Sequence, residues 1–441
     1  MSPVIDRRTF LQTLSVGAAA LPLASNQLFA QAGRKVRHAS FGASGMALSD
    51  IKSFSSHPAF DLVAVADVDL SKVEPLKALF PKVRVYQDWR ELLKKEADNL
   101  DSVNVSTPDH MHAPIAIAAM ARGKHVYVQK PLATTVLETR RLAAAARDKR
   151  LVSQMGIQIS SHPTQLATEL MIRNGVIGKV REVHTFCNKT WGDMNPIPSG
   201  SDPIPSTLNW DMWLGVGEKR PYKEGVYHPG NWRKRVGFGT GTLGDMGCHI
   251  FSTPIRGVNL YLPIEITSYG PGAVHGNWPI DAKLKLVFPG TQVTAGKTLD
   301  FWWYDGATRP PETVAAAVGG TLPASGVVIL GTDGAILLPH IGPPTLHPAD
   351  TFAGRVVPTV PERNHYHEFL DAVLAGPGTV CSAGFDYASR VTEAVLLGSV
   401  AEHYPNQTLK YEPATMRVTS HKEPNAYLTR SFRKKYLLTS L

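Results

Sequence analysis

The stretch VRHASFGASGMA, residues 36–47, decides the fold of the first part of the chain. Its first half has the length and character of a short buried strand, and its second half places small residues at the first, third and sixth positions of a turn. Such a turn, between a strand and a helix, lets the backbone approach a pyrophosphate and predicts a dinucleotide site. Ser44 stands where glycine is usual and crowds that approach, whereas Gly45 beside it restores backbone freedom. The turn residues predicted to bind the cofactor are Gly42, Ser44, Gly45 and Met46.

Strand-like and helix-like segments alternate after this turn. Ser71 and Asp88 each precede a glutamate by three residues, which is the spacing of a capping box at a helix start. Gly123 is expected to end a further helix. Strands are predicted at 36–41, 62–67, 83–86, 102–106 and 125–128. The alternation indicates a parallel, doubly wound sheet.

Three polar segments follow these strands. Asp67 ends the second one, where a carboxylate accepts hydrogen bonds from the ribose of adenosine and repels a 2′-phosphate, which favours NAD over NADP. The turns STPDHMH (106–112) and QKPL (129–132) follow later strands. Because open α/β sheets bind ligands at the carboxyl ends of their strands, these segments supply the other predicted NAD contacts: Asp67, Ser106, Thr107, Pro108, His112, Gln129 and Lys130.

The composition excludes several classes of protein. Of 441 residues, 43% are hydrophobic and 19% charged, which is typical of a globular chain, and no apolar run is long enough to span a membrane. Residues 415–441 hold six basic residues and one acidic residue of a chain with net charge +9, so the remaining body is too weakly basic to indicate a nucleic-acid partner. This tail is expected to be solvated or to contact another subunit.

Buried free thiols are predicted for Cys187, Cys248 and Cys381, which lie far apart.

Residues 1–32 have the architecture of an export signal. Arg7 and Arg8 begin it, a mildly apolar stretch covers 11–23, and Ala-Gln-Ala at 30–32 supplies small residues for cleavage. The run DRRTFL resembles a twin-arginine signal, which implies export of an already folded protein, often with its cofactor inside, to the periplasm or otherwise out of the cytoplasm.

The second half combines scaffold with an aromatic region. Residues 151–158 are expected to cross over from the first domain, and 180–188 to begin a second sheet. Further strands are predicted at 265–269, 283–288, 298–304 and 327–338, with helices at 364–376 and 387–404 packed beneath them. The region 189–242 is rich in Gly, Pro and Trp; its tryptophans either stack on sugar faces or pack the region itself. Its predicted substrate ligands are His228, Trp232 and Arg233. No metal site is expected, since His365 and His367 face different sides of a helix.

The motif GTLGDMGCHIF (241–251) places Asp245 and His249 one helical turn apart. A carboxylate at this spacing orients an imidazole and raises its basicity, and imidazole is well suited to moving a proton near neutral pH. Together with GASGMA, VADVD, STPDHMH and GKHVYVQKPL, in this order, the motif resembles the Gfo/Idh/MocA oxidoreductases from about Val36 to Tyr427.

The resemblance implies an α/β fold. An N-terminal Rossmann domain with a doubly wound parallel sheet is followed by a C-terminal α/β domain on an open, mostly antiparallel sheet, whose face commonly carries subunit contacts. We therefore expect a twin-arginine signal peptide (1–32), an NAD-binding domain (33–155), a substrate and oligomerisation domain (156–414) and a basic tail (415–441).

The resemblance also implies catalytic roles. The family residues that match Lys130, Asp245 and His249 meet at the nicotinamide: His249 is expected to act as base, Asp245 to orient it or the substrate, and Lys130 to stabilise negative charge on the reacting oxygen. The family's usual Glu-Lys-Pro is Gln-Lys-Pro here. Because Gln129 removes a negative charge beside Lys130, the lysine should ionise less readily by electrostatics alone; whether this tunes it or is neutral stays open.

Three functions are compatible with these expectations. The first is an NAD-dependent oxidoreductase acting on the CH–OH group of a sugar or glycoside, with a tightly bound cofactor because little free NAD is expected outside the cytoplasm. The second is an NAD-dependent glycosidase that works by transient oxidation and elimination. The third is a non-catalytic sugar-binding protein, which the departures at Ser44 and Gln129 permit. The expected partners are a carbohydrate and further copies of the chain, without nucleic acid or membrane anchor.

Overall fold

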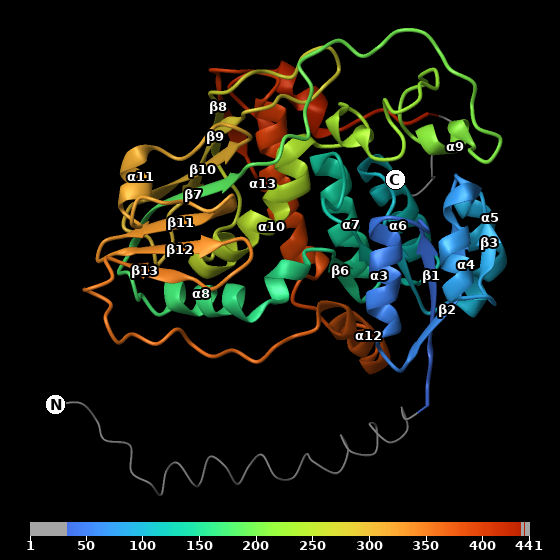
Figure 1. Ribbon diagram of the computed structural model, residues 1–441, viewed down its shortest axis with the longest axis horizontal. Coiled ribbons are helices and arrows are strands. Elements are labelled where there is room, and N and C mark those ends of the chain that lie inside the picture. Colours follow the sequence, from blue (N-terminus) through green and yellow to red (C-terminus); the bar gives the residue numbers. More distant parts are fainter. Residues whose placement is uncertain (1–32, 434–435, 437–441) are drawn as a thin grey trace, which may run out of the picture.

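The computed structural model describes residues 33–433 and 436, so the predicted export signal at 1–32 lies outside the described residues. Two sheets lie side by side with helices between them (Figure 1). The first sheet is parallel and has the order β3-β2-β1-β4-β5-β6. Since β1 pairs with both β2 and β4, the strand order reverses there, which is where such sheets bind ligands. Its strands are β1 (Val36–Phe41), β2 (Phe60–Ala66), β3 (Arg84–Tyr86), β4 (Ser102–Val105), β5 (His125–Val128) and β6 (Ser153–Met155).

The five predicted strands and the Rossmann topology are confirmed, and β6 adds a sixth strand within the expected crossover. The helices of this domain are α3 (Met46–Ser55), α4 (Glu74–Leu79), α5 (Trp89–Glu96), α6 (His112–Ala121) and α7 (Val136–Asp148). Asp88 caps α5 as predicted, accepting a hydrogen bond from the backbone of Arg90. The expected cap at Ser71 is wrong: Asp69 instead caps a short 3₁₀ helix by accepting from the backbone of Ser71, and α4 begins without a side-chain cap.

The second sheet has nine strands in the order β13-β12-β11-β7-β10-β9-β8-β14-β15. Only the β7–β10 pairing is parallel, so the predicted open, mostly antiparallel sheet is confirmed. Its strands are β7 (Val180–Cys187), β8 (Glu265–Ser268), β9 (Lys283–Pro289), β10 (Thr298–Asp305), β11 (Ser325–Gly331), β12 (Ala335–Pro339), β13 (Thr345–His347), β14 (Thr408–Glu412) and β15 (Arg417–Val418). Because β15 pairs with β14, this sheet continues past the expected boundary at residue 414.

The remaining helices are α8 (Pro163–Arg173), α9 (Trp210–Leu214), α10 (Gly241–Val258), α11 (Glu312–Ala316), α12 (His365–Ala375) and α13 (Phe385–Ala401). Helices α10 and α13 lie with α7 between the two sheets (Figure 1). Helix α12 does not pack beneath the second sheet as expected. Its apolar face instead completes the core of the first domain, where the ring of Phe369 lies 5.9 Å from Phe54 and 6.0 Å from Tyr127.

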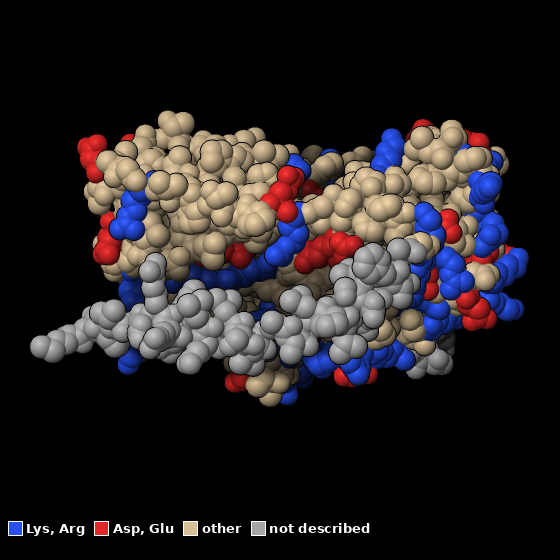
Figure 2. All heavy atoms as spheres, turned by 90° about the horizontal axis from the view of Figure 1, so that it is seen from below, with Lys and Arg blue, Asp and Glu red and all other residues tan. Residues whose placement is uncertain are grey.

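The described part of the basic tail binds its own chain rather than standing free in solvent. Arg430 donates to the buried Glu138 at 3.0 Å through Nε, and Arg433 donates to Asp211 at 2.6 Å. On the face shown in Figure 2, basic and acidic side chains are intermingled at the end formed by the first domain, while the second domain is largely uncharged. No helix between residues 33 and 433 combines the length and apolar character needed to cross a membrane.

Candidate active site

A cavity of about 890 Å³ opens where β1, β2, β4 and β5 end and lies between the two domains. Its lining combines backbone turns of the first domain with polar and aromatic side chains of the second. It contains every residue predicted from the sequence as a site residue, namely Gly42, Ser44, Gly45, Met46, Asp67, Ser106, Thr107, Pro108, His112, Gln129, Lys130, His228, Trp232, Arg233, Asp245 and His249.

The glycine-rich turn is shaped by close backbone approach. Gly42 has φ +106°, and a Cβ there would lie 2.8 Å from the carbonyl oxygen of Ser106 and 2.9 Å from the Cβ of Ala47, so only glycine fits. Gly45 has φ +55° with no atom near its missing Cβ, and α3 begins at the next residue. The unpaired backbone donors of this helix start therefore face the cavity, which suits the pyrophosphate of a dinucleotide.

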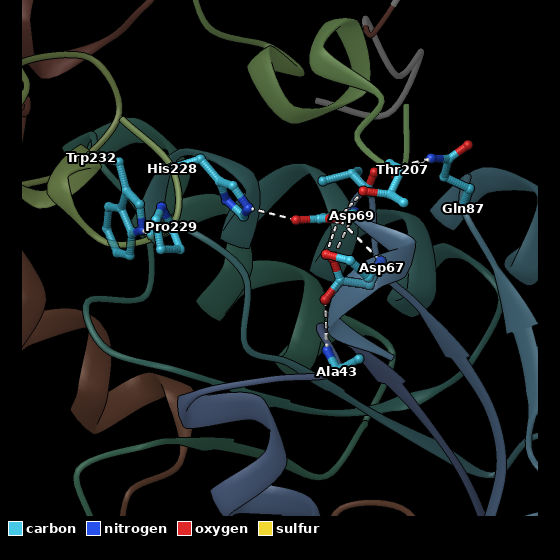
Figure 3. A network of polar contacts seen from close by, with 10 residues as sticks. Ala43, Asp67, Asp69, Gln87, Thr207, His228, Pro229 and Trp232 are labelled. Carbon is cyan, nitrogen blue, oxygen red and sulfur yellow. Dashed lines mark hydrogen bonds and ion pairs between the residues drawn. The ribbon is translucent and has the colours of Figure 1, made fainter. Parts of the chain in front are cut away.

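Two further groups fit a dinucleotide. The carboxylate of Asp67 accepts hydrogen bonds from the backbone of Ala43 at 2.9 Å and of Asp69 at 3.0 Å, which fixes it beside the turn (Figure 3). Burial raises the pKa of this carboxyl. Oγ1 of Thr107 is buried in the cavity wall and has no hydrogen-bond partner in the described part of the chain, so a ligand could satisfy it.

The aromatic region of the second domain reaches over this end of the cavity. Nε2 of His228 lies 2.9 Å from Oδ2 of Asp69, whose Oδ1 accepts from the hydroxyl of Thr207 at 3.0 Å (Figure 3). Gln87 donates to the carbonyl oxygen of Thr207 at 3.1 Å and strengthens the same junction. His228 is therefore held at the Asp67 end of the cavity, and its predicted role as a substrate ligand stays a prediction.

At the other end, Lys130 and Asp245 meet across the domain boundary. Nζ of Lys130 lies 2.7 Å from Oδ1 of Asp245, and Nε of Arg233 lies 3.3 Å from the same oxygen. Nζ of Lys189 is 3.8 Å from Oδ2. Burial opposes ionisation of Asp245, but the charges of these three cations outweigh it and hold the pKa of the carboxyl well below its usual range.

His249 lines the cavity one turn beyond Asp245 on α10. Burial, followed by the charge of Lys130, lowers the pKa of its imidazole well below the ordinary value. Its Nδ1 is buried without a hydrogen-bond partner in the described ranges, and the carboxylate of Asp245 makes its polar contacts with cations instead. The expected orientation of His249 by Asp245 is thus not seen; Asp245 holds Lys130.

The side-chain amide of Gln129, which lines the cavity, also contacts a buried carboxylate that the sequence did not single out. Its Nε2 donates to both oxygens of Asp50 at 3.0 Å, and Asp50 also accepts from Ser106 at 2.7 Å and Tyr366 at 2.8 Å. Burial raises the pKa of Asp50 to about 6, and the charge of Lys130 is among the factors that oppose this rise. Asp50, which contacts Gln129, therefore carries the negative charge that a glutamate at position 129 would supply.

Other predicted residues have structural contacts. The two ring nitrogens of His112 lie 2.7 and 2.8 Å from the carbonyl oxygens of Pro131 and Thr107, so His112 joins the two turns to each other. Trp210 stacks on Trp213 with 4.7 Å between centroids and packs the aromatic region, whereas Trp191, Trp213 and Trp232 line the cavity.

The cysteines are buried and free, as predicted. Within the described residues no group of three metal-ligating side chains occurs.

Comparison with known proteins assigns the two domains. Residues 36–157 match the family model described as "Oxidoreductase family, NAD-binding Rossmann fold", and residues 179–261 match the family's C-terminal alpha/beta domain. The chain belongs to the Gfo/Idh/MocA family. NAD is the cofactor of this family's Rossmann domain, and the open turn, Asp67 and the unpartnered Thr107 hydroxyl fit it.

Several relatives of this Gfo/Idh/MocA protein are named for carbohydrates. It is 28% identical to a levoglucosan dehydrogenase of Pseudarthrobacter phenanthrenivorans over 37% of this chain and 34% of the relative. It is 31% identical to an alpha-N-acetylgalactosaminidase of Shewanella oneidensis over 33% of each. The matches thus span about a third of these curated relatives. An aldose-aldose oxidoreductase of Caulobacter crescentus shares the fold, with a TM-score of 0.55 and 17% identity over 86% of this chain and all of that one.

Four residues in or beside the site escaped sequence reasoning: Lys189 and His340 line the cavity, whereas Asp50 and Asp69 contact the lining residues Gln129 and His228. Asp50 had a signal, because it lies on the buried stripe of α3 with Ala47, Ile51 and Phe54, where an acid is out of place. Lys189 and His340 are brought to the cavity by tertiary packing, and no local pattern marks them. Asp69 belongs to the VADVD motif, but its contact with His228 depends on the second domain.

Proposed function

We propose that this protein is an NAD-dependent oxidoreductase that acts on the CH–OH group of a sugar or glycoside. The observation that carries the proposal is the 2.7 Å pair of Lys130 and Asp245 with His249, in the same cavity as the dinucleotide turn. When bound, NAD supplies hydride acceptance and return at its nicotinamide ring. The residues of both domains supply the proton chemistry and the orientation of the substrate.

The roles of the side chains follow from their environment. His249, whose lowered pKa keeps the imidazole neutral, accepts the proton of the reacting hydroxyl. Lys130 donates a hydrogen bond to the reacting oxygen and stabilises its negative charge. Asp245, kept ionised, fixes the position of Lys130 and accepts from a neighbouring hydroxyl of the substrate. The indole of Trp191, which is half-buried in the cavity wall, offers an apolar face for the sugar ring.

Export and cofactor retention belong to the same proposal. The twin-arginine-like segment at residues 1–32 supports export to the periplasm with NAD already bound. The contacts of Asp69 with His228 and Thr207, which join the two domains over one end of the cavity, would slow cofactor loss. A retained cofactor must regain its original redox state in each cycle. We therefore propose a reaction in which one sugar is oxidised and a second is reduced.

Two measurements test this proposal. The absorbance of the purified protein before and after denaturation should reveal a released nicotinamide nucleotide, and its absence together with no NAD affinity would favour a non-catalytic sugar-binding protein. Mass spectrometry of products from a sugar and glycoside library should then show a keto-sugar. A free sugar that has exchanged a ring hydrogen would indicate a hydrolytic cycle instead.

The second candidate is an NAD-dependent glycosidase, which the match to an alpha-N-acetylgalactosaminidase supports. In that reaction the sugar is oxidised transiently, the leaving group departs by elimination, water adds, and the sugar is reduced again. Release of nitrophenol from a broad panel of nitrophenyl glycosides tests it, and no release from any of them would remove it.

We also propose association of copies through the second sheet. Tyr269 is 44% exposed there, and its ring stacks on that of Trp302 at 5.9 Å beside Lys283 and Lys285. Light scattering of the purified protein should give a mass above 47.9 kDa.

A further inference from the structure

The end of the cavity that holds Asp245 carries more positive than negative charge. Lys130, Arg233 and Lys189 all lie within 4 Å of this one carboxylate. Of the other carboxylates in the lining, Asp67 lies at the opposite end beside the glycine-rich turn, and Asp109 is turned toward Thr240, which donates to it at 2.7 Å. Burial raises the pKa of Asp109, which favours its neutral form.

The two histidines in this part of the cavity do not change the balance of positive and negative charge. Their rings lie 5.8 Å apart, and burial lowers the pKa of both His249 and His340, so both are neutral near pH 7. Lys130 is satisfied by its short pair with Asp245. The surplus positive charge therefore belongs to Arg233 and Lys189.

Both of these cations have unused donors. Arg233 uses only Nε toward Asp245, and no side chain or carbonyl of the described residues accepts from its two terminal nitrogens. Its guanidinium lies 4.3 Å from the ring centre of Trp232 and 5.3 Å from that of Trp191, which holds the plane in place. Nζ of Lys189 has no hydrogen bond in the part of the chain that the structure describes, and its side chain is 50% exposed.

We propose that Arg233 and Lys189 form an anion subsite, and that the sugar substrate carries a carboxylate, as in a uronic acid or its glycoside. This inference rests on the proposed function and names its substrate class. A planar guanidinium with two free donors matches a carboxylate in two-pronged geometry, and the lysine adds a point charge. An anion also replaces the hydration that both cations lose when a ligand fills the cavity. The phosphates of NAD are served elsewhere, by the turn from Gly42 to Met46.

The test is titration calorimetry on the purified, NAD-saturated full chain. Three pairs of ligands are compared: D-glucuronate with D-glucose, D-galacturonate with D-galactose, and D-mannuronate with D-mannose. In at least one pair the uronate should bind about tenfold more tightly, because a two-pronged ion pair is added. Raising the salt concentration should weaken binding of the uronate and leave that of the neutral sugar unchanged.

Variants assign the effect to the two cations. Lys189→Gln should lower uronate affinity about tenfold while changing that of the neutral sugar less than twofold, and Lys189→Arg should retain it. Arg233→Gln should lower uronate affinity more than that of the neutral sugar. Lys149→Gln, which removes an exposed lysine at the end of α7, is the matched control and should change nothing.

The outcomes separate this inference from the proposed function. Equal binding within all three pairs, or equal loss of uronate and neutral sugar in the variants, overturns the anion subsite. A parallel loss of NAD affinity in the variants also overturns it, because the cations would then serve the dinucleotide. Equal binding of D-glucose 6-sulfate overturns the choice of a carboxylate. If uronates bind as expected and no sugar is turned over, the proposed function fails and the anion subsite stands. If neutral sugars are turned over and uronates are not preferred, the anion subsite fails and the proposed function stands.

Discussion

Lys130 and Asp245 form an ion pair across the domain boundary, with 2.7 Å between Nζ and Oδ1 and side chains only 14% and 10% exposed. Lys130 is the second residue after the end of β5 in the first domain, and Asp245 lies on α10 in the second. The reactive groups are therefore aligned only when the two domains are packed together. Removing either partner leaves the other charged in a largely desolvated site.

Replacing Lys130 by alanine should lower kcat by about 10²-fold or more, because the reacting oxygen loses its charged donor. NAD affinity should change little, since the turn from Gly42 to Met46 and Asp67 lie elsewhere in the cavity. Steady-state kinetics and NAD titration measure the two quantities. Equal loss of both would discredit the assignment of Lys130. Thermal unfolding serves as the control for a general loss of structure.

The pH dependence should follow the neutral state of His249. Burial and the charge of Lys130 lower the pKa of this imidazole well below 6.5, so the base is free of its proton at neutral pH and remains so as the pH falls through 6.5. Asp245, whose pKa is also lowered, stays ionised over the same range. Measured in the Asp50→Asn variant, which removes the carboxyl whose pKa is about 6, the value of kcat should therefore be flat between pH 7 and 6 and fall only at lower pH. Half-loss near pH 6.5 would contradict this, and His249→Gln should abolish the acid limb.

Much of this architecture was predictable from the sequence because local rules decide it. The periodicity of residues 36–128 identified the first sheet, and the small residues from Gly42 to Ala47 located the cofactor turn, where a Cβ would collide with the backbone of Ser106. The spacing of Asp245 and His249 placed both on one helix at the cavity. Such features depend on neighbours in the chain, so a single sequence carries them.

The remainder depends on contacts between distant segments. The short strands β13 and β15 are formed only by pairing with longer neighbours, and α12 is directed to the first domain by Phe54 and Tyr127, which lie far from it in the sequence. Asp245 and His249 have helical spacing, yet Lys130 takes the carboxylate because it approaches from the other domain. No local sequence pattern shows that Lys130, rather than His249, contacts Asp245.

The junction between Asp69 and His228 should govern cofactor release. His228→Ala removes the 2.9 Å contact and one of the links between the aromatic region and the first domain, so the dissociation rate of NAD should rise about fivefold to tenfold, as for loss of one hydrogen bond to a charged group. The value of kcat with saturating NAD should stay within about twofold. Stopped-flow displacement of NADH measures the release. A change in KM for the sugar without a change in NAD release would instead support the predicted role of His228 as a substrate ligand.

Asp50 should replace the negative charge that Gln129 lacks. Asp50→Asn keeps the size of the side chain but removes the buried charge near Lys130, so kcat should fall about tenfold, and the double variant Asp50→Asn/Gln129→Glu, which moves the charge to position 129, should restore most of it. Tyr366→Phe removes one hydrogen bond to Asp50 at 2.8 Å but no charge and is the matched control, with little change in kcat expected. Failure of the double variant to recover activity would show that the charge is not what matters.

The same substitution makes a separate prediction about stability. Burial raises the pKa of Asp50 to about 6, above its value of 3.8 in an unfolded chain, so the native state binds this proton more tightly. The carboxyl therefore lowers the free energy of unfolding progressively between pH 3.8 and about 6, and by a constant amount of about 1–3 kcal/mol above that range. The Tm of Asp50→Asn relative to the natural chain should accordingly rise between pH 4 and pH 7. A Tm difference that is independent of pH would show that Asp50 carries no perturbed charge in the folded protein.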